Sequence, residues 1–142
     1  MKQILKRNMV QETGASGWMA DFGEHLPFDA ILHSGVEASL FHNQYPLEWA
    51  KINEEALAEY NIETGVYSNE LVYFMRSASL TSPGHTSLFW LGDQCVSWDS
   101  FDGIKTIVTA ALSGGIGGHS LTHSDIGGYT MVRSTNQIYL AH

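Results

Sequence analysis

The chain has 142 residues, and 7 Lys and Arg against 15 Asp and Glu give it a formal net charge of −8. Charged residues make up 15% of it, against about 25% in ordinary globular domains. The composition excludes a disordered or disulfide-rich chain, because there is one cysteine and no low-complexity tract. No apolar run reaches the ~20 residues of a membrane span. Without a cluster of Lys or Arg, neither nucleic acid nor an anionic membrane is expected as a partner.

The first part of the chain predicts a helix, a short strand and a long loop. Residues 1–12 carry apolar side chains near helical spacing and end before a glycine-rich stretch. The apolar run at residues 18–20 stops abruptly at Asp21, which predicts a buried strand that enters a loop. Residues 22–44 are rich in Gly, Pro and His and predict a loop.

A clear helix is predicted to begin at Pro46 and to end at Gly65, since proline favours a first helical turn and glycine a helix end. Large apolar side chains recur along one side of this segment. The opposite side carries three glutamates that we interpret as a solvated face, namely Glu54, Glu55 and Glu59.

The second part of the chain predicts two further strands, a helix and a last strand. Residues 70–75 and 88–91 are apolar runs typical of buried strands. Residues 101–112 have helical periodicity, residues 116–121 predict a fourth strand, and the tail from Met131 predicts a helix. Near-continuous apolar strands bounded by helices favour an α/β fold whose parallel strands are buried on both faces.

All four predicted strands end at ionisable residues, which are Asp21, Arg76, Asp93 and the pair His123 and Asp125. In parallel α/β folds the carboxyl ends of the strands face the ligand. Four such endings in succession favour one shared site over the ordinary polarity of loops.

Two aspartates on separate strands suit the cleavage of a glycosidic bond, in which one carboxyl group donates a proton and the other attacks or activates water. Trp90 and Trp98 lie near Asp93 in sequence, and aromatic surroundings favour the neutral acid that a proton donor needs. Asp21 needs the opposite environment, with a donor such as Arg76 beside it. The alternative, in which both aspartates only shape their loops, stays open on spacing alone.

Other chemistries have weaker support in the sequence. His119, His123 and Asp125 are residue types that bind metal ions. In the predicted strand, however, the four-residue offset between His119 and His123 spans ~13 Å, too far for both side chains to bind one ion. The glycines at 114–118 follow a predicted helix, whereas a phosphate loop follows a strand, so we interpret them as sites of close packing. Cys95 is a lone cysteine beside a predicted strand end, and we interpret it as inert.

Four motifs together resemble glycoside hydrolase family 31, the retaining α-glycosidases, and in particular its sulfoquinovosidase branch. The likeness runs from about Arg7 to Val132, with the motifs in the family's order. They are GWMADFGEHLP at 17–27, the arginine of FMRS at 74–77, WLGDQ with the following Trp98 at 90–98, and HSDIGGY at 123–129.

The resemblance implies a double displacement with Asp21 as the nucleophile and Asp93 as the general acid and base, their carboxyl groups about 5–5.5 Å apart. It implies that Glu24 supports the site through hydrogen bonds. No metal or organic cofactor is implied, and the partner is a small glycoside. The residues that the resemblance places around the bound sugar are Arg76, Trp90, Asp125, Tyr129 and His123.

The resemblance also favours a sulfonated sugar, because Tyr129 stands where many α-glucosidases of the family carry Phe, and ADFGE replaces their DMNE. The tyrosine of the sulfoquinovosidase branch helps to hold the sulfonate. The branch's sulfonate-binding Gln, Arg and Trp would lie outside these 142 residues. A neutral α-glucoside and a non-catalytic sugar-binding remnant are the alternatives.

The length agrees with part of a larger fold. A (β/α)₈ barrel takes ~250 residues, or ~31 per unit, so 142 residues correspond to between four and five units. We therefore expect residues 1–142 to be a fragment of a single catalytic TIM barrel, covering roughly its fourth to seventh strands. We expect the fragment alone to be inactive and poorly soluble, because it exposes two sheet edges.

Overall fold

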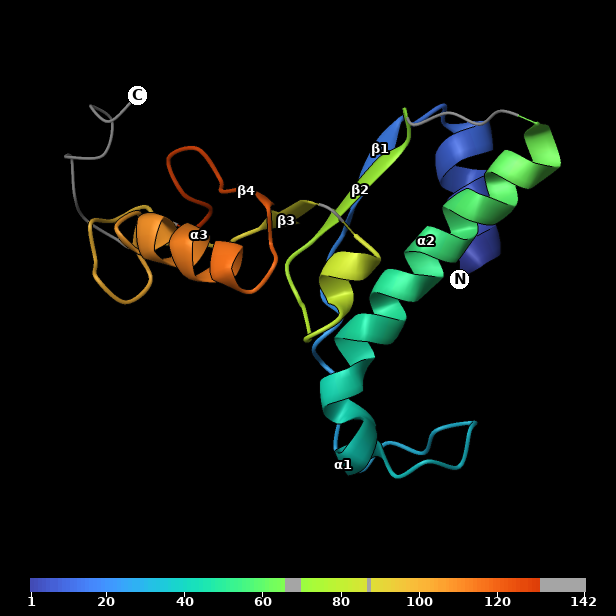
Figure 1. Cartoon of the computed structure of the whole chain (residues 1–142), viewed down its shortest axis with the longest axis horizontal. Helices are drawn as coiled ribbons and strands as arrows, with labels where there is room; N and C mark the ends of the chain where they lie inside the picture. The colour runs from blue at the N-terminus through green and yellow to red at the C-terminus, as the bar shows by residue number, and fades with distance from the viewer. Residues whose placement is uncertain (66–69, 87, 131–142) are drawn as a thin grey trace. The chain divides into compact units, whose positions relative to one another are not determined.

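The computed structural model describes residues 1–65, 70–86 and 88–130 (Figure 1). The chain divides into two compact units, Met1–Thr86 and Ser87–His142. Each unit contains one pair of parallel strands, β1 with β2 in the first and β3 with β4 in the second. The predicted α/β class with parallel strands is thereby confirmed.

The first unit contains the predicted elements with small shifts and three short helical turns in addition. The predicted helix at 1–12 is wound as a π-helix, and the predicted loop at 22–44 ends in α1 and η2, so it is not loop throughout. In chain order the elements are η1 (Ile4–Glu12), β1 (Gly17–Ala20), α1 (Ala38–Phe41), η2 (His42–Gln44), α2 (Tyr45–Thr64), β2 (Val72–Met75) and η3 (Ser82–Gly84).

Strands β1 and β2 bury one face only. Their inward side chains, Trp18 and Tyr73 among them, are buried, whereas Met19 is 47% and Val72 44% exposed. The prediction that these strands are buried on both faces is therefore wrong for the part of the chain that the structure describes. The rings of Trp18 and Tyr73 stack with their centroids 5.9 Å apart, and the Tyr73 hydroxyl donates a hydrogen bond to the Ala50 carbonyl of α2, 3.1 Å away.

Helix α2 packs on these strands through small side chains. It begins at Tyr45, one residue before Pro46, and is followed by Gly65, whose φ of 67° gives the left-handed turn that terminates many helices. Its buried positions include Ala50, Asn53 and Ala56, at helical spacing, and not the larger apolar residues that the periodicity suggests. Asn53 is fully buried, and its side-chain carbonyl accepts a hydrogen bond of 2.8 Å from the indole of Trp18. This pairing satisfies two polar groups that would otherwise be buried without partners.

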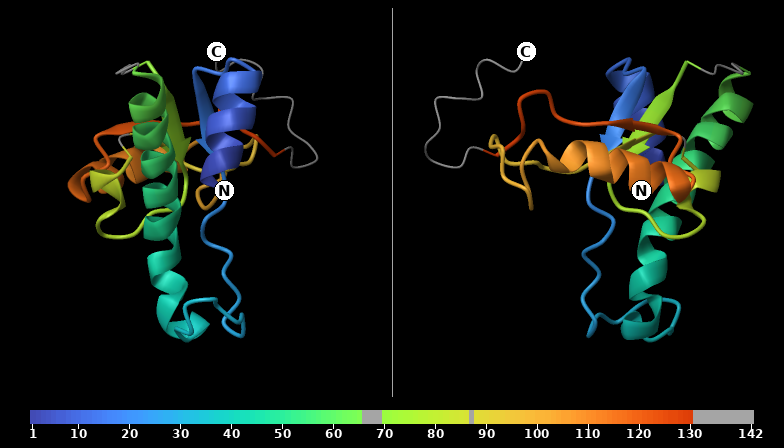
Figure 2. Two further views of the ribbon diagram at one scale, coloured as in Figure 1. Left: turned by 90° about the vertical axis from the view of Figure 1, so that its right-hand side faces the viewer. Right: turned by 60° about the vertical axis from the view of Figure 1, so that its left-hand side comes forward.

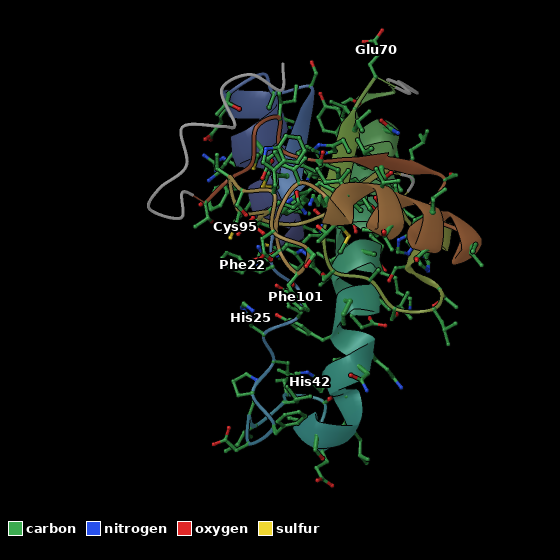
Figure 3. The ribbon with its side chains drawn as sticks, turned by 90° about the vertical axis from the view of Figure 1, so that its left-hand side faces the viewer. Phe22, His25, His42, Glu70, Cys95 and Phe101 are labelled. Atoms are coloured by element: carbon green, nitrogen blue, oxygen red, sulfur yellow. The ribbon has the colours of Figure 1, made fainter. Side chains whose placement is uncertain are left out.

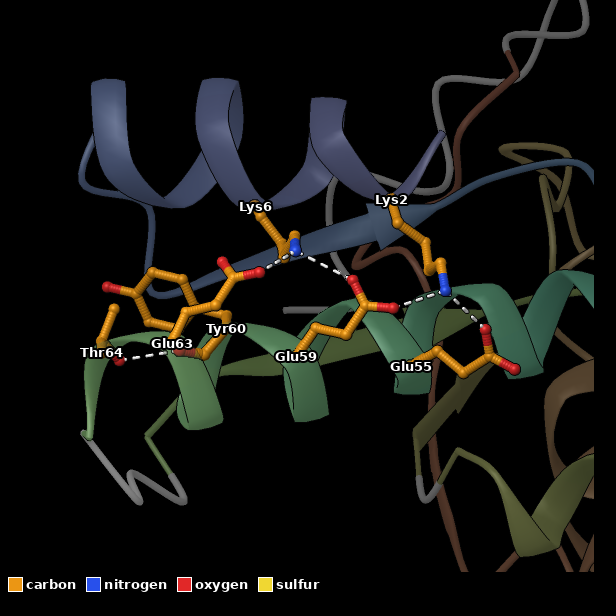
Figure 4. Close-up of polar contacts among 7 residues, drawn as sticks. All are labelled: Lys2, Lys6, Glu55, Glu59, Tyr60, Glu63 and Thr64. Atoms are coloured by element: carbon orange, nitrogen blue, oxygen red, sulfur yellow. Dashed lines mark hydrogen bonds and ion pairs between the residues drawn. The ribbon is translucent and has the colours of Figure 1, made fainter.

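The N-terminal helix η1 lies beside the C-terminal half of α2 (Figures 1 and 2). A ladder of ion pairs joins the two segments (Figure 4). Lys2 and Lys6 both bind Glu59, at 2.5 and 2.8 Å. Lys2 also binds Glu55 at 3.0 Å, and Lys6 binds Glu63 at 2.6 Å. Glu55 and Glu59 of the predicted solvated face remain exposed to solvent, with 56% and 39% of their side chains accessible, and their carboxylates also bind a second segment of the chain.

The third predicted member of that face also has a partner. The Glu54 carboxylate lies 2.7 Å from Nδ1 of His85. Here α2 reaches the segment that follows β2, so its glutamates contact structure on both sides of the helix.

The second unit consists of β3 (Leu88–Trp90), α3 (Thr106–Ile116) and β4 (Leu121–His123). The helix predicted at 101–112 begins late because Asp99 accepts hydrogen bonds from the backbone amides of Phe101 and Asp102, at 2.7 and 3.1 Å, which forms a turn. It then continues to Ile116, so the strand predicted from Ile116 begins only at Leu121. The helix predicted from Met131 lies outside the described residues.

The ladder of ion pairs predicts that the contact between η1 and α2 weakens in acid. Hydrogen bonds from Lys2 and Lys6 lower the pKa of Glu59 from 4.5 to about 2. A depressed pKa stabilises the fold above pH 4.5 and loses this contribution as the pH falls from 4.5 towards 2. We expect hydrogen exchange at the amides of η1, corrected for intrinsic rates, to accelerate across this window in the native protein and to depend less on pH in Glu59→Gln.

Glu48→Gln is the matched control for this experiment, because Glu48 pairs with Lys51 inside α2, at 2.7 Å, and does not contact η1. Its exchange profile should follow that of the native protein. An unchanged pH dependence in Glu59→Gln would contradict the role assigned to the ladder.

Candidate active site

The end of β1 brings Asp21 next to Arg76, the first residue after β2. The parallel register pairs Ala20 with Met75, so the residues that follow them become neighbours. One oxygen of Asp21, Oδ1, accepts a hydrogen bond of 2.7 Å from the amide of Phe22 and lies 3.4 Å from Nε of Arg76. The predicted pairing of Asp21 with a cationic donor is therefore present.

Glu24 shares the same guanidinium group. Its Oε1 accepts hydrogen bonds from Nε and Nη2 of Arg76, at 3.0 and 2.8 Å. The side chain of Arg76 is 18% exposed, against 37% for Asp21 and 34% for Glu24. A mostly buried cation thus holds two carboxylate side chains that are each about one-third exposed.

An aromatic ring covers one side of the cation. The guanidinium carbon of Arg76 lies 4.9 Å from the ring centroid of Phe22, within the range of a cation–π contact. Phe22 is 55% exposed, and its ring meets the imidazole of His25 at a centroid distance of 5.5 Å. Both side chains lie on the loop that follows β1 (Figure 3). The ring limits water around the guanidinium, so its attraction for the carboxylates is less screened.

One acceptor in this group has no protein partner. Among the described residues, Oε2 of Glu24 is buried without a hydrogen bond. An unsatisfied buried carboxylate oxygen is costly, so the hydrogen bonds that Oε1 accepts from Arg76 carry the contacts of this carboxylate with the protein.

In the second unit, Asp93 lies on the loop that follows β3 and is exposed. The next residue, Gln94, is buried, and its backbone carbonyl accepts hydrogen bonds from the amides of Tyr129 and Thr130, at 2.8 and 3.2 Å. These bonds tie the loop of Asp93 to the loop of Tyr129. Sequence reasoning missed Gln94 as a connector, because a backbone contact leaves no local pattern.

The remaining predicted sugar-binding residues also lie in this unit. Trp90 is 2% exposed and stands beside His123 in the β3–β4 register. The Asp125 carbonyl accepts a hydrogen bond of 3.0 Å from the amide of Gly128, which forms a turn before Tyr129, and Tyr129 is 67% exposed.

The structure therefore groups the predicted site residues within the units. Asp21, Glu24 and Arg76 are in direct contact in the first unit. Trp90, Asp93, His123, Asp125 and Tyr129 occupy the ends of β3 and β4 and the loops that follow them in the second unit. The aromatic surroundings of Asp93 stay a prediction, with Trp90 buried and Trp98 42% exposed.

The competing chemistries gain no geometric support. In residues 1–65, 70–86 and 88–130, no three His, Cys, Asp or Glu side chains lie close enough to hold a metal ion. The ring of His119 instead stacks on Phe89, with a centroid distance of 4.2 Å. Burial and the neighbouring Asp102 raise the pKa of the Cys95 thiol, which disfavours the reactive thiolate. Across the described part of the chain, every helix is too short or too polar to cross a membrane.

Comparison with known proteins identifies the class of protein to which the chain belongs. Residues 1–140 match the glycosyl hydrolases family 31 TIM-barrel domain. The chain belongs to glycoside hydrolase family 31, and its two strand pairs are part of that family's barrel.

Several individual proteins of this family that resemble the chain are sulfoquinovosidases. The chain is 50% identical over 129 residues to a sulfoquinovosidase of Escherichia coli strain K12 and 43% identical over 129 residues to one of Agrobacterium fabrum. Each alignment covers 91% of this chain and 18% of the relative. The structure matches a family 31 sulfoquinovosidase from E. rectale, in complex with the aza-sugar inhibitor IFGSQ, with a TM-score of 0.85 at 42% identity, over 98% of this chain and 20% of that one. The chain thus spans about a fifth of the length of the relatives it matches.

The shared guanidinium group predicts that Arg76 orders the loop after β1. In Arg76→Gln the two carboxylates lose their common cation, and we expect the local free energy of opening to fall by about 1–3 kcal/mol. Hydrogen exchange at the amides of residues 22–26 measures this change. Arg7→Gln is the control, because it removes an exposed ion pair with Glu12, at 2.8 Å, and should leave exchange in the loop unchanged. Unchanged exchange in Arg76→Gln would contradict the prediction.

Proposed function

We propose that this chain supplies the nucleophile, the proton donor and part of the sugar-binding surface of a retaining α-glycosidase that hydrolyses α-sulfoquinovosides. The observation that carries the proposal is the Asp21 carboxylate, held at the end of β1 by the Phe22 amide and Arg76. The similarity to sulfoquinovosidases supports the substrate class.

Asp21 acts as the nucleophile in this proposal. Its Oδ1 is engaged by the Phe22 amide and faces Nε of Arg76, so we assign the attack on the anomeric carbon to Oδ2. A carboxylate fixed through one oxygen loses little orientational freedom during the attack, which favours the reaction. Glu24 acts through Arg76, whose guanidinium it holds beside Asp21.

Asp93 acts as the acid and then as the base. It protonates the glycosidic oxygen as the bond to the leaving group breaks and Asp21 forms a β-linked glycosyl-enzyme. Asp93 then takes a proton from water, which attacks the same carbon and releases Asp21. Two inversions retain the α configuration of the sugar.

We further propose that residues 1–142 are one part of a single catalytic barrel, corresponding to roughly its fourth to seventh strands. The share of the relatives that the chain covers and its two parallel strand pairs support a part of a barrel. The order of the four motifs, which resembles the order in the family, supports the choice of strands. Activity then requires the complete barrel, and the isolated 142 residues are expected to be inactive.

Replacement of the two carboxylates tests the mechanism in the complete enzyme. Asp21→Asn should abolish turnover of an aryl glycoside, because no glycosyl-enzyme can form. Asp93→Asn should lower turnover by about 10²–10⁴-fold, and less for a 4-nitrophenyl glycoside, whose leaving group needs little protonation. Added azide should restore turnover in Asp93→Ala with an α-glycosyl azide as the product, because the anion attacks the β-linked glycosyl-enzyme without needing a general base. Native turnover in either Asn variant would refute the role of that residue.

The substrate class has a separate test. We expect the complete enzyme to hydrolyse 4-nitrophenyl α-sulfoquinovoside with a higher kcat/KM than 4-nitrophenyl α-glucoside. Tyr129→Phe should raise KM for the sulfonated substrate and leave KM for the glucoside unchanged, because only the sulfonate uses the hydroxyl group. A preference for the glucoside would leave the mechanism intact and replace the substrate by a neutral α-glucoside.

A further inference from the structure

We propose that Trp49 and Ser77 are positioning residues for Asp21, which hold the loop after β1 in a left-handed backbone conformation. Neither residue is assigned a contact with the sugar. The inference rests on the proposed role of Asp21 as the nucleophile.

The loop leaves β1 through two residues with positive φ. Phe22 has φ 61° and Gly23 has φ 90°. Glycine adopts such angles freely, but Phe22 is the only described non-glycine residue that does so, and its Cβ is crowded there. A disfavoured conformation of this kind persists only where the surrounding structure imposes it.

The strained residue is the one that orients the nucleophile. Its amide donates the 2.7 Å hydrogen bond to Oδ1 of Asp21. Relaxation of Phe22 to an ordinary backbone conformation would therefore shift a donor that the Asp21 carboxylate uses.

Two side chains from outside the loop bind the carbonyl groups that flank Asp21 and Phe22. The indole of Trp49, on α2, donates to the Ala20 carbonyl at 3.2 Å. The hydroxyl of Ser77, beyond the end of β2, donates to the Phe22 carbonyl at 2.7 Å. The carbonyl before Asp21 and the carbonyl after Phe22 are thus both fixed from outside the loop.

The same two side chains also enclose Gly23. A Cβ added to Gly23 would lie 2.5 Å from Oγ of Ser77 and 2.6 Å from Cδ1 of Trp49, closer than atoms can approach. The backbone of the loop therefore rests directly on both side chains. Steric contact and hydrogen bonding from the same pair of residues select one loop conformation.

The test uses the complete enzyme. Its kinetic constants are measured with 4-nitrophenyl α-sulfoquinovoside or 4-nitrophenyl α-glucoside, whichever the native enzyme hydrolyses faster. Trp49→Phe removes the indole donor and keeps an aromatic ring, and Ser77→Ala removes the hydroxyl donor. We expect each variant to lower kcat and the first-turnover release of 4-nitrophenol by tenfold or more, with KM changed less than threefold. Ser77→Thr, which keeps the hydroxyl, should retain at least a third of native kcat.

Matched controls separate positioning from general stability. Trp18→Phe removes an indole hydrogen bond between β1 and α2, to Asn53 at 2.8 Å, and Ser82→Ala removes a buried hydroxyl that accepts from the Ser79 amide at 2.8 Å. Both should lower the thermal midpoint and leave kcat within threefold of native. Native kcat in Ser77→Ala, or an equal loss of kcat in the controls, would overturn the inference. Should Trp49→Phe fail to fold, Ser77→Ala and Ser77→Thr still decide the question.

A covalent probe separates this inference from the proposed function. The 5-fluoro glycosyl fluoride of the hydrolysed sugar forms a slowly hydrolysed glycosyl-enzyme, and peptide mapping identifies the labelled residue. Native enzyme labelled elsewhere than Asp21 would refute the proposed function. Labelling at Asp21 in the native enzyme, with the same rate in Ser77→Ala, would refute only the positioning role. Labelling at Asp21 that slows tenfold in Ser77→Ala supports both.

Discussion

The contact between one guanidinium group and two carboxylates is the interaction on which the first unit depends. Arg76 can reach Asp21 and Glu24 only because β1 and β2 run parallel in a register that pairs their last residues. That register places a cation and an anion at adjacent strand ends, and the ring of Phe22 covers one side of the cation. Strand pairing thus places Arg76 beside Asp21, and the loop after β1 adds the Glu24 carboxylate and the Phe22 ring.

Helix α2 connects this site to the rest of the unit. Its small residues let the helix approach the strands, and its buried Asn53 accepts a hydrogen bond from the indole of Trp18 on β1. Trp49, four residues before Asn53, then reaches the carbonyl next to Asp21. The ion pairs with η1 brace the opposite end of the helix. Helix α2 therefore contacts the loop of the site directly through Trp49, while its other contacts hold it to the rest of the unit.

Local sequence pattern predicts the elements that local chemistry determines. Pro46 and Gly65 gave the bounds of α2 within a residue, and the abrupt ends of the apolar runs placed Asp21, Arg76 and Asp93 at strand ends. The late start of α3 was missed, because the turn at Asp99 competes with helix in a segment of helical periodicity. The ladder between η1 and α2 was missed because its partners lie more than 50 positions apart. The hydrogen bond from Trp49 to the Ala20 carbonyl cannot be predicted from periodicity, because periodicity records the apolar character of a residue and not the direction of an indole N–H.

The enclosure of Gly23 also limits how this site can change over time. Because Ser77 and Trp49 occupy the space of any side chain at position 23, a larger residue there requires one of the two to shrink first. Loss of either one, however, removes a donor to the loop carbonyls. Substitutions at positions 23, 49 and 77 therefore have to occur together during evolution, because each of them alone is unfavourable. A coupled trio of this kind would appear in related sequences as covariation among three positions that are distant along the chain.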